Sequence, residues 1–450
     1  MVTSSTSQAD YLEQVLAALE SESPERLNEV VDSLHPADIA DVLEALPPSQ
    51  RSQVWPQVRH ENMGEVLAEV AEGVRPSLLE PLDEAVLVQA IGRLDTDDIA
   101  DLIPDLPEEV VSRLLFVLDK NGRAQLDAVL AYPEDTAGGL MDVDVLTVRE
   151  DITLGVAQRY LRKLGSIPAD TNKLFVVDRK GYLTGVLYLS TLLTDDPGMR
   201  VSEAMKTDVV KFNVLSPDTD VAAAFERYNL ITAPVVDENN RLVGRITIDD
   251  VVDVIRDEAG HSVMAAAGLR DEEDIFAPVG RSARNRSVWL GVNLLTAILA
   301  SWVIGLFEGT IQQLVALAVL MPIVASMGGN AGIQTVTLVV RGIALGVVTD
   351  TTVRRVLVRE LMVGVLNSVI WAMVIGVITV FWFDNIMLGV VIGLAMVINL
   401  IIAALAGVVI PIAVRMMGID PVLASGVALT TVTDVVGFLT FLGLAALMLM

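Results

Sequence analysis

The sequence predicts a multidomain protein made of an all-α superhelical N domain, a tandem of α/β modules and an all-α transmembrane domain of five helices. Three observations support this fold class. Net charge is confined to one half of the chain, long apolar stretches follow one another in the other half, and two internal repeats occupy the charged half.

Charge and hydrophobicity are segregated along the chain. The 450 residues carry a net charge of −27, although 52% of them are hydrophobic. Residues 281–450 contain 8 Arg, no Lys and 6 acids, a net charge of +2, which leaves −29 for residues 1–280. Because so acidic a region repels phosphate backbones, we expect no nucleic acid partner.

The composition also argues against several chemistries. The chain has no cysteine, which excludes disulfides, zinc–thiolate sites and a thiol nucleophile. Its 3 histidines, His35, His60 and His261, are scattered, and no nucleophile and base stand at a catalytic spacing. We therefore expect a protein that is not an enzyme and has no catalytic residues.

Five apolar stretches are each long enough to cross a bilayer, which takes roughly 20 residues. They cover residues 287–307, 309–340, 361–383, 385–414 and 421–450, and only the last contains a charge. A buried helix of a soluble protein is the alternative for any single stretch. Five in succession favour membrane spans, so the lipid bilayer is an expected partner.

Arginine placement predicts the orientation. Arginines precede the first span and lie between spans two and three and between spans four and five, whereas the opposite loops carry Glu308 and Asp384. Cytoplasmic loops are enriched in Lys and Arg. The first 18 residues also lack the pattern of a cleavable signal peptide. We expect a multi-pass protein of the cell (plasma) membrane with a cytoplasmic N-terminus and an extracytoplasmic C-terminus.

Asp434 is the single charge inside the fifth span. Asp420 and Pro421 mark the start of that helix as an N-cap and a first-turn proline. Asp434 lies 14 residues after Asp420, roughly 20 Å along the helix and near the bilayer midplane. A carboxylate there usually faces a bundle interior or a water-filled path. Thr430 and Thr431, one turn earlier, place hydroxyls on its face.

A polar stripe follows the second span. It comprises Ser326, Asn330, Gln334, Thr337 and Arg341, at spacings of 4, 4, 3 and 4 residues. Together with Asp434 it offers the oxygen ligands that suit a hydrated Mg²⁺ ion. A second interpretation stays open, in which the stripe only supports helix packing and Asp434 pairs with Arg341 or with span-two amides.

Five spans are few for enclosing a pore, and each chain supplies only one intramembrane acid. A symmetric dimer would bring two Asp434 carboxylates to a shared axis. We therefore expect a homodimer.

Two internal repeats organise residues 1–260. Residues 34–47 match residues 94–107 at 7 of 14 positions within a leucine-rich helical stretch, which predicts a small α-solenoid. Further on, the pattern Val-Val-Asp with a following Leu and Gly occurs at residues 176–185 and recurs 59 residues later. Each copy predicts strand, turn, strand and then a helix near Thr191 or Asp250.

This second repeat resembles the paired cystathionine-β-synthase-type (CBS) domain, a fold that often binds adenine nucleotides. The second copy keeps the helix entry Thr247-x-x-Asp250, whereas the first copy has Tyr188 and Thr191. The resemblance implies ATP as a ligand of the CBS pair, with Thr247 as its binding residue.

The full order of parts resembles the MgtE family of magnesium channels. The most specific matches are residues 137–141 (AGGLM), 328–334 (GGNAGIQ) and 433–437 (TDVVG). The resemblance implies an acidic helical N domain (1–135), CBS domain 1 (136–200), CBS domain 2 (201–258), a connecting or plug helix (259–286) and a transmembrane domain (287–450).

The resemblance implies a metal site in the pore. Asp434 matches the residue that binds hydrated magnesium, and the other pore residues are Thr337, Asn330, Ala428 and Thr431. Ile333 stands where relatives have an asparagine, so one polar pore contact is missing.

The resemblance also implies regulatory Mg²⁺ ions that close the pore when cytosolic magnesium is plentiful. The matching acids are Glu65, Asp97, Asp101, Asp250, Asp253, Glu258 and Asp420. For each acid the alternative is a solvated helix face, and Asp420 has the further alternative of a plain N-cap. His261, Ser262 and Asn229 stand where relatives have acids, which implies fewer or weaker regulatory ions.

The implied function is a magnesium-selective channel gated closed by intracellular magnesium. A secondary transporter that couples Mg²⁺ to another cation, with Asp434 as the protonatable carrier, is one alternative. A CBS-domain membrane sensor without transport is another, and the mid-membrane Asp434 argues against it. Oxygen ligands alone do not separate magnesium from manganese, cobalt or nickel.

Overall fold

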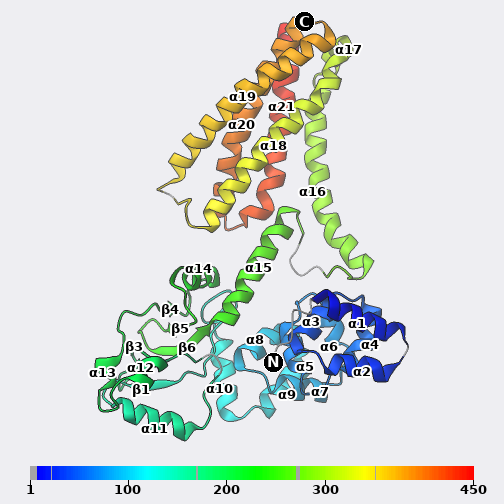
Figure 1. Ribbon diagram of the computed structural model, residues 1–450. Helices are drawn as coiled ribbons and strands as arrows, with labels where there is room; N and C mark the ends of the chain where they lie inside the picture. Colours follow the sequence, from blue (N-terminus) through cyan, green and yellow to red (C-terminus); the bar gives the residue numbers. More distant parts are fainter. Residues whose placement is uncertain (1–7, 22, 169–170, 270–273, 350) are drawn as a thin grey trace. The chain divides into compact units, whose positions relative to one another are not determined.

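The computed structural model describes residues 8–21, 23–168, 171–269, 274–349 and 351–450 (Figure 1). They form two compact units. Unit 1 comprises Met1–Gly260 and Glu272–Ala277, and unit 2 comprises His261–Asp271 and Pro278–Met450. The fold class predicted from the sequence is confirmed, with a helical region, two small sheets and a bundle of long apolar helices in chain order.

The first part of unit 1 is helical throughout its described residues. Its elements are α1 (Gln8–Glu20), α2 (Pro24–Asp32), α3 (Pro36–Glu44), α4 (Pro48–Val54), η1 (Trp55–Gln57), α5 (Met63–Glu69), α6 (Arg75–Leu79), α7 (Glu84–Ile91), α8 (Thr96–Leu102), η2 (Ile103–Asp105), α9 (Glu108–Val117) and α10 (Lys120–Val129). Proline opens α2, α3 and α4, where its missing N–H costs nothing. These frequent starts explain why the helices are short.

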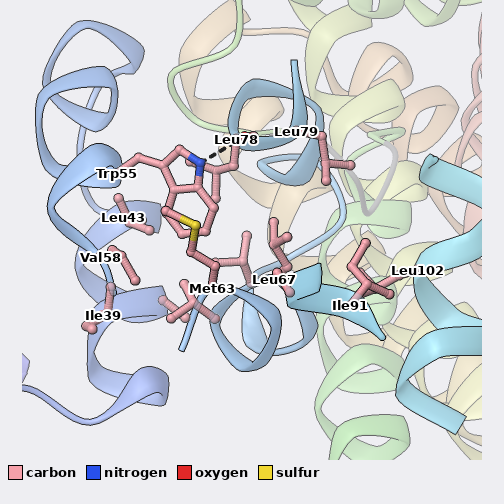
Figure 2. Close-up of a cluster of buried hydrophobic side chains, with 14 of the residues drawn as sticks. Ile39, Leu43, Trp55, Val58, Met63, Leu67, Leu78, Leu79, Ile91 and Leu102 are labelled. Atoms are coloured by element: carbon pink, nitrogen blue, oxygen red, sulfur yellow. Dashed lines mark hydrogen bonds between the residues drawn. The ribbon is translucent and has the colours of Figure 1, made fainter. Parts of the chain in front are cut away.

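The short helices share one hydrophobic core, shown in Figure 2. Trp55 lies at its centre, 1% exposed, and its indole N–H donates a hydrogen bond of 2.9 Å to the Leu78 carbonyl. Leu43, Met63 and Leu67 are equally buried around it. The ring therefore joins α3, α5 and α6 while its polar atom is satisfied.

Two three-stranded sheets follow, with the same topology. The first consists of β1 (Thr147–Arg149), β2 (Lys173–Val177) and β3 (Leu183–Tyr188), and the second of β4 (Phe212–Asn213), β5 (Thr232–Val236) and β6 (Leu242–Thr247). The first pair in each is parallel and the second antiparallel, and the register shifts at the equivalent Val-Val step. The helices beside them are α11 (Leu154–Leu164), α12 (Leu189–Thr194), α13 (Val201–Ala204), α14 (Asp218–Tyr228) and α15 (Ile248–Ala266).

The repeated Met and Gly residues pack across the two copies. A methyl group at Gly244 would fall 2.7 Å from the Met141 sulfur, and one at Gly185 would fall 3.1 Å from the Met205 sulfur. Each methionine therefore packs against the glycine of the other copy. The methionine that precedes one sequence repeat belongs, in space, to the other sheet.

Unit 2 is a bundle of long helices, α16 (Val279–Gly305), α17 (Glu308–Gln313), α18 (Ala316–Ala344), α19 (Val353–Phe383), α20 (Ile386–Met416) and α21 (Pro421–Met448). Five of them are long and apolar enough to span a membrane, and α20 is the most apolar and the most buried. The α20 helix packs against α18, α19 and α21, as Figure 1 shows. The described residues thus confirm five candidate spans.

Two predicted boundaries differ from the structure. The stretch 309–340 is not one helix, because α17 ends before Leu314 leaves helical geometry (φ −137°, ψ 86°) and α18 begins at Ala316. The connecting helix expected at 259–286 is also divided. Helix α15 ends before Gly268 in a left-handed conformation (φ 72°), and Pro278 precedes the start of α16. The lack of charged residues in the stretch 309–340 does not reveal the break at Leu314.

A buried ion pair ties the segment after α15 to the helical part of unit 1. The Arg51 guanidinium donates to both Asp274 carboxylate oxygens, at 2.6 and 3.0 Å, and to the Leu43 carbonyl at 2.7 Å. The side chains of Arg51 and Asp274 are only 1% and 8% exposed. The Phe276 ring lies 6.0 Å from the guanidinium carbon. Residues 274–277 are therefore anchored to α4.

Asp274→Ala should loosen this anchor. Losing hydrogen bonds to a charged group costs about 1.5–3 kcal/mol, which corresponds to about tenfold to a hundredfold faster opening. Hydrogen exchange of the α3 and α4 amides in the full chain measures it. Asp32→Ala is the control, since its partner Arg59 is 53% exposed and this change should have little effect. Equal exchange in both variants would contradict the anchor.

Candidate functional site

Asp434 lies at the middle of the 28-residue helix α21 and is half-buried in the single chain. Within the described residues no side chain or backbone group forms a hydrogen bond or ion pair with its carboxylate. The pairing with Arg341 that the sequence left open is therefore not formed within one chain. The carboxylate stays available for a cation.

The hydroxyls near Asp434 are bonded to their own helix. Thr431 donates to the Val427 carbonyl at 2.7 Å, and Thr430 donates to Gly426 and Val427 at 3.1 and 3.0 Å. A hydroxyl oxygen that donates in this way keeps its lone pairs as acceptors. Thr431 can therefore still present an oxygen to an ion or its water, and Ala428, half-buried, lies one turn before it.

The polar stripe of α18 is exposed in the single chain. Its members Ser326, Asn330, Gln334, Thr337 and Arg341 all lie on the surface of the bundle. The one contact between two of them is weak, from the Asn330 amide to the Ser326 hydroxyl at 3.3 Å. Ile333 lies beside them and is 45% exposed. The stripe is a polar face on a membrane helix.

The structure does not join the stripe to Asp434 by any hydrogen bond among the residues it describes. The predicted pore residues therefore divide into two sets within one chain. Thr337 and Asn330 lie on the exposed face of α18, and Asp434, Ala428 and Thr431 lie on α21.

Asp420 is engaged as a helix cap. Its Oδ1 accepts from the Val422 N–H at 2.9 Å, and its Oδ2 accepts from the Leu423 N–H at 3.3 Å and lies 3.0 Å from His261 Nε2. These contacts use the oxygens that a regulatory ion would need. Among the acids predicted to bind regulatory magnesium, Asp420 thus has an identified structural role. Ser262 lies exposed next to His261 on α15.

Asn229 also has a structural role. It ends α14 in the left-handed conformation, with φ 49° and ψ 52°. Asparagine tolerates this conformation better than most residues. The left-handed backbone therefore suits the asparagine at this position.

Acidic side chains of α8 and α15 face one another within unit 1, and we call this group the acidic junction. It comprises Asp97, Asp98 and Asp101 of α8 and Asp249, Asp250 and Asp253 of α15. Asp97 lies close enough to Asp250, and Asp101 to Asp253, for each pair to repel electrostatically. Four predicted regulatory residues, Asp97, Asp101, Asp250 and Asp253, are therefore brought together.

Burial and repulsion favour protons at the acidic junction. Burial, then the charge of Asp97, raises the pKa of Asp250 to about 8. Burial, then the charge of Asp142, raises the pKa of Asp97 to about 7. Burial, then the charge of Asp97, raises the pKa of Asp98 to about 7. Asp97 Oδ1 is buried without a hydrogen-bond partner in the described structure. The charges of Arg75 and Arg256 partly offset the repulsion at Asp101 and Asp253, whereas burial and neighbouring acids dominate at Asp97, Asp98 and Asp250.

The other predicted ligands lie elsewhere. Glu65 is exposed on α5, and Glu258 is exposed further along α15. No three His, Cys, Asp or Glu side chains of the described residues converge closely enough to enclose a metal ion. The structure therefore presents pairs of carboxylates. Mg²⁺ commonly takes only one or two carboxylates and keeps its waters.

Thr247 is buried at the end of β6, and its hydroxyl donates to Asp250 Oδ2 at 2.8 Å. The backbone N–H of Thr247 reaches the same oxygen at 3.3 Å. Thr247 and Asp250 thus form one bonded pair at the helix entry, and this pair belongs to the acidic junction as well as to the predicted nucleotide site.

Sequence reasoning missed several acids that act on the junction. Asp98 and Asp249 are members of the junction themselves, and Asp95, Asp142 and Glu69 raise the pKa of its members by repulsion. Asp98 and Asp249 are adjacent in sequence to the predicted residues Asp97 and Asp250, and this adjacency could have identified them. Asp142 lies far from α8 in sequence, and it already pairs with the buried Arg245 at 2.9 Å.

Comparison with known families agrees with the order of domains. Residues 321–444 match the model of the MgtE divalent cation transporter domain, residues 34–135 match the MgtE intracellular N domain, and residues 137–196 and 201–257 match the CBS domain. The magnesium transporter MgtE of Thermus thermophilus is 32% identical over 437 residues, 96% of this chain and 97% of that protein. This chain belongs to the MgtE family.

Two further similar proteins were found. The magnesium transporter MgtE of Bacillus subtilis is 29% identical over 418 residues, 92% of each chain. A crystal structure of the cytosolic domain of the Mg²⁺ channel MgtE in complex with ATP is 33% identical, with a TM-score of 0.48, and covers 54% of this chain and 99% of that one. MgtE membership supports magnesium transport by a multi-pass membrane protein.

Neutralising the acidic junction should stabilise it. A carboxyl whose pKa rises from 3.8 to about 8 on folding costs stability increasingly as pH rises through that window. Asp97→Asn/Asp250→Asn should therefore slow hydrogen exchange of α8 and the first turns of α15 at pH 8 without divalent ions, relative to the unaltered chain at the same pH. The gap should close near pH 4. Asp220→Asn, an exposed first-turn acid of α14, is the control. Faster exchange in the double variant at pH 8 would contradict the repulsion.

Proposed function

We propose that this MgtE-family chain is a magnesium-selective channel that intracellular magnesium closes. The observation that carries the proposal is Asp434, a carboxylate at the middle of α21 with no partner in the described residues. An unpaired charge at that depth costs several kcal/mol unless water or a cation reaches it. A hydrated Mg²⁺ ion would supply charge and water together.

A homodimer would complete the pore. In a bilayer, the exposed stripe of α18 would leave amides and hydroxyls facing hydrocarbon, which provides no hydrogen bonds. A second copy related by a two-fold axis would cover the stripe and bring two Asp434 carboxylates to one path. The ion's water shell would then meet side-chain oxygens of Asn330, Thr337 and Thr431. Ala428 would contribute its backbone carbonyl oxygen.

The acidic junction supports closure by magnesium. Divalent cations would offset the repulsion between α8 and α15, so they would bind the closed arrangement more tightly than the separated one. By linkage, a ligand with such a preference shifts the population to the closed state. Glu65 and Glu258 would add weaker sites on the same domains. Asp420, already used as a cap, would contribute little.

Nucleotide binding is a subordinate part of the proposal. Thr247 and Asp250 form the helix entry at which the CBS resemblance implies ATP. The repulsion between Asp250 and Asp97 disfavours a polyanion there, because the local field is negative. We propose that ATP binds beside Thr247 only when magnesium neutralises the junction.

We also propose a plasma-membrane orientation with the N-terminus inside. The arginines that flank the spans support it. In Figure 1, α17 and the C-terminus lie at the same end of the bundle, as this topology requires. With this orientation the acidic junction would lie in the cytoplasm, where it would meet intracellular magnesium.

A secondary transporter is the second candidate, because an unpartnered carboxylate could also carry a proton. Currents through reconstituted protein separate the two. Discrete single-channel openings without proton coupling favour the channel, and stoichiometric proton movement favours the transporter.

Asp434→Asn should abolish magnesium uptake by a transport-deficient cell. The substitution keeps the size of the side chain but removes the charge that compensates the ion. Asp384→Asn is the control, because Asp384 lies in the turn between α19 and α20, where its left-handed backbone suits asparagine. Uptake by Asp434→Asn equal to that of the control, at equal expression, would refute a permeation role.

Asp250→Ala/Asp253→Ala should raise magnesium flux at high internal magnesium. The change removes two carboxylates that closure would bridge, so inhibition should need more magnesium. Glu108→Ala/Glu109→Ala, in the exposed first turn of α9, removes the same charge elsewhere in unit 1. Flux measured at several internal concentrations checks this, and unchanged inhibition in the junction variant would defeat the gating proposal.

A further inference from the structure

Asn399 is a fully buried polar residue at the centre of the membrane bundle. It lies near the middle of α20, is 0% exposed and was not among the residues predicted from the sequence. Burying an amide among apolar side chains is unfavourable unless hydrogen bonds compensate. A polar side chain at this position therefore needs a specific reason.

The amide is held between two glycines on different helices. A methyl group at Gly328 of α18 would fall 2.3 Å from Asn399 Nδ2, and one at Gly437 of α21 would fall 2.9 Å from it. Side chains do not approach backbone so closely where a Cβ is present. The glycines thus leave the space that the amide occupies.

One hydrogen bond orients the amide. Its Nδ2 donates to the Val324 carbonyl of α18 at 2.9 Å. Its Oδ1 is buried without a hydrogen-bond partner in the described part of the chain. The Asn399 side chain therefore forms a hydrogen bond with α18 and also contacts α21. Through this residue α20 touches both helices at the same level of the bundle.

These two helices carry the proposed pore residues. Gly328 lies two residues before Asn330, and Gly437 lies one turn after Asp434. A change in how either helix seats on Asn399 would move a pore residue without touching the ion.

We propose that Asn399 is a positioning residue for permeation, which fixes the spacing between the polar face of α18 and Asp434 through Gly328 and Gly437. The inference rests on the proposed function, because it takes Asp434 to be the residue that the ion passes. It adds a determinant on α20, a helix that contributes no proposed ligand.

The test compares three variants in proteoliposomes. Asn399→Ala removes the amide, Gly328→Ala places a methyl against it, and the double variant Gly328→Ala/Asn399→Ala fits that methyl into the vacated space. Each single variant should raise the magnesium concentration for half-maximal flux about threefold to twentyfold, the range expected for an interhelical hydrogen bond. The double variant should recover more than the two single effects predict. The ratio of Mg²⁺ flux to Mn²⁺ flux should change in each single variant and return toward the value of the unaltered chain in the double variant.

Controls separate positioning from folding. Asn367→Ala changes an exposed asparagine of α19, and Gly291→Ala adds a methyl to α16 where nothing lies within 4 Å. Both should leave the half-maximal concentration unchanged. A purely structural role of Asn399 would reduce the amount of folded protein but not change the concentration dependence or ion ratio of the folded fraction.

A distance measurement supplies a second readout. The chain has no cysteine, so spin labels at Leu338→Cys of α18 and Leu439→Cys of α21 report one separation when labelled chains are diluted with unlabelled ones. Asn399→Ala should change it by about 1–2 Å, the size of typical helix shifts, and the double variant should restore it.

An unchanged spacing, or a changed spacing with unaltered half-maximal concentration, would overturn the positioning role. Should Asn399→Ala fail to fold, Gly328→Ala and the double variant carry the same comparison. Failure of the proposed function has a different signature, namely equal flux in the unaltered chain and in Asp434→Asn.

Discussion

A carboxylate removed from water needs a compensating charge, and at two places important to the proposed function the described residues supply little or none of it. One is the acidic junction, where α8 and α15 present acids to each other and burial raises the pKa of Asp250 to about 8. The other is Asp434 in α21. Elsewhere the chain supplies the partner, as Arg51 does for Asp274 and Arg245 does for Asp142. The contrast singles out the two uncompensated places.

Both places suit a hydrated divalent cation for the same reason. Mg²⁺ keeps most of its water, so it needs few protein ligands and tolerates ligands that do not enclose it. A site for such an ion therefore needs only uncompensated carboxylates next to accessible polar groups. Under the proposed function, such sites need no closed cluster of metal ligands, and none is found among the described residues.

Much of the fold could be predicted because its signals are local or repeated. The apolar stretches predicted the membrane helices, and the Val-Val-Asp repeat predicted two sheets of equal topology. The break at Leu314 was missed because the stretch around it carries no charge beyond Glu308, and Gln312 and Gln313 are compatible with a continuous helix. The exchange of Met141 and Met205 between the copies also depends on tertiary contacts, which a repeat in the sequence does not reveal.

The candidate site was predictable where a residue type is itself unusual. A lone aspartate in an apolar span is such a case, and Asp434 was found in this way. The grouping of Asp97 with Asp250 came only from the family resemblance, because the two are far apart in the chain. Asn399 was missed, although an isolated asparagine in the most apolar span is a comparable signal. Its role depends on Gly328 and Gly437, which lie on other helices and contact Asn399 only in the folded bundle.

The central place of α20 has a consequence for biosynthesis. The helices α18 and α19 are consecutive in the chain, yet they share little contact: α19 packs mainly against α20, and α18 packs against both α20 and α21. A ribosome delivers α20 fourth among the five candidate spans. Helix α19 therefore enters the bilayer without its main packing partner, and close packing of α18 and α19 into the bundle must wait until α20 has been inserted. Until then, the α18 surface at Gly328, which packs on Asn399 of α20, depends on lipid, or on the insertion machinery, for cover.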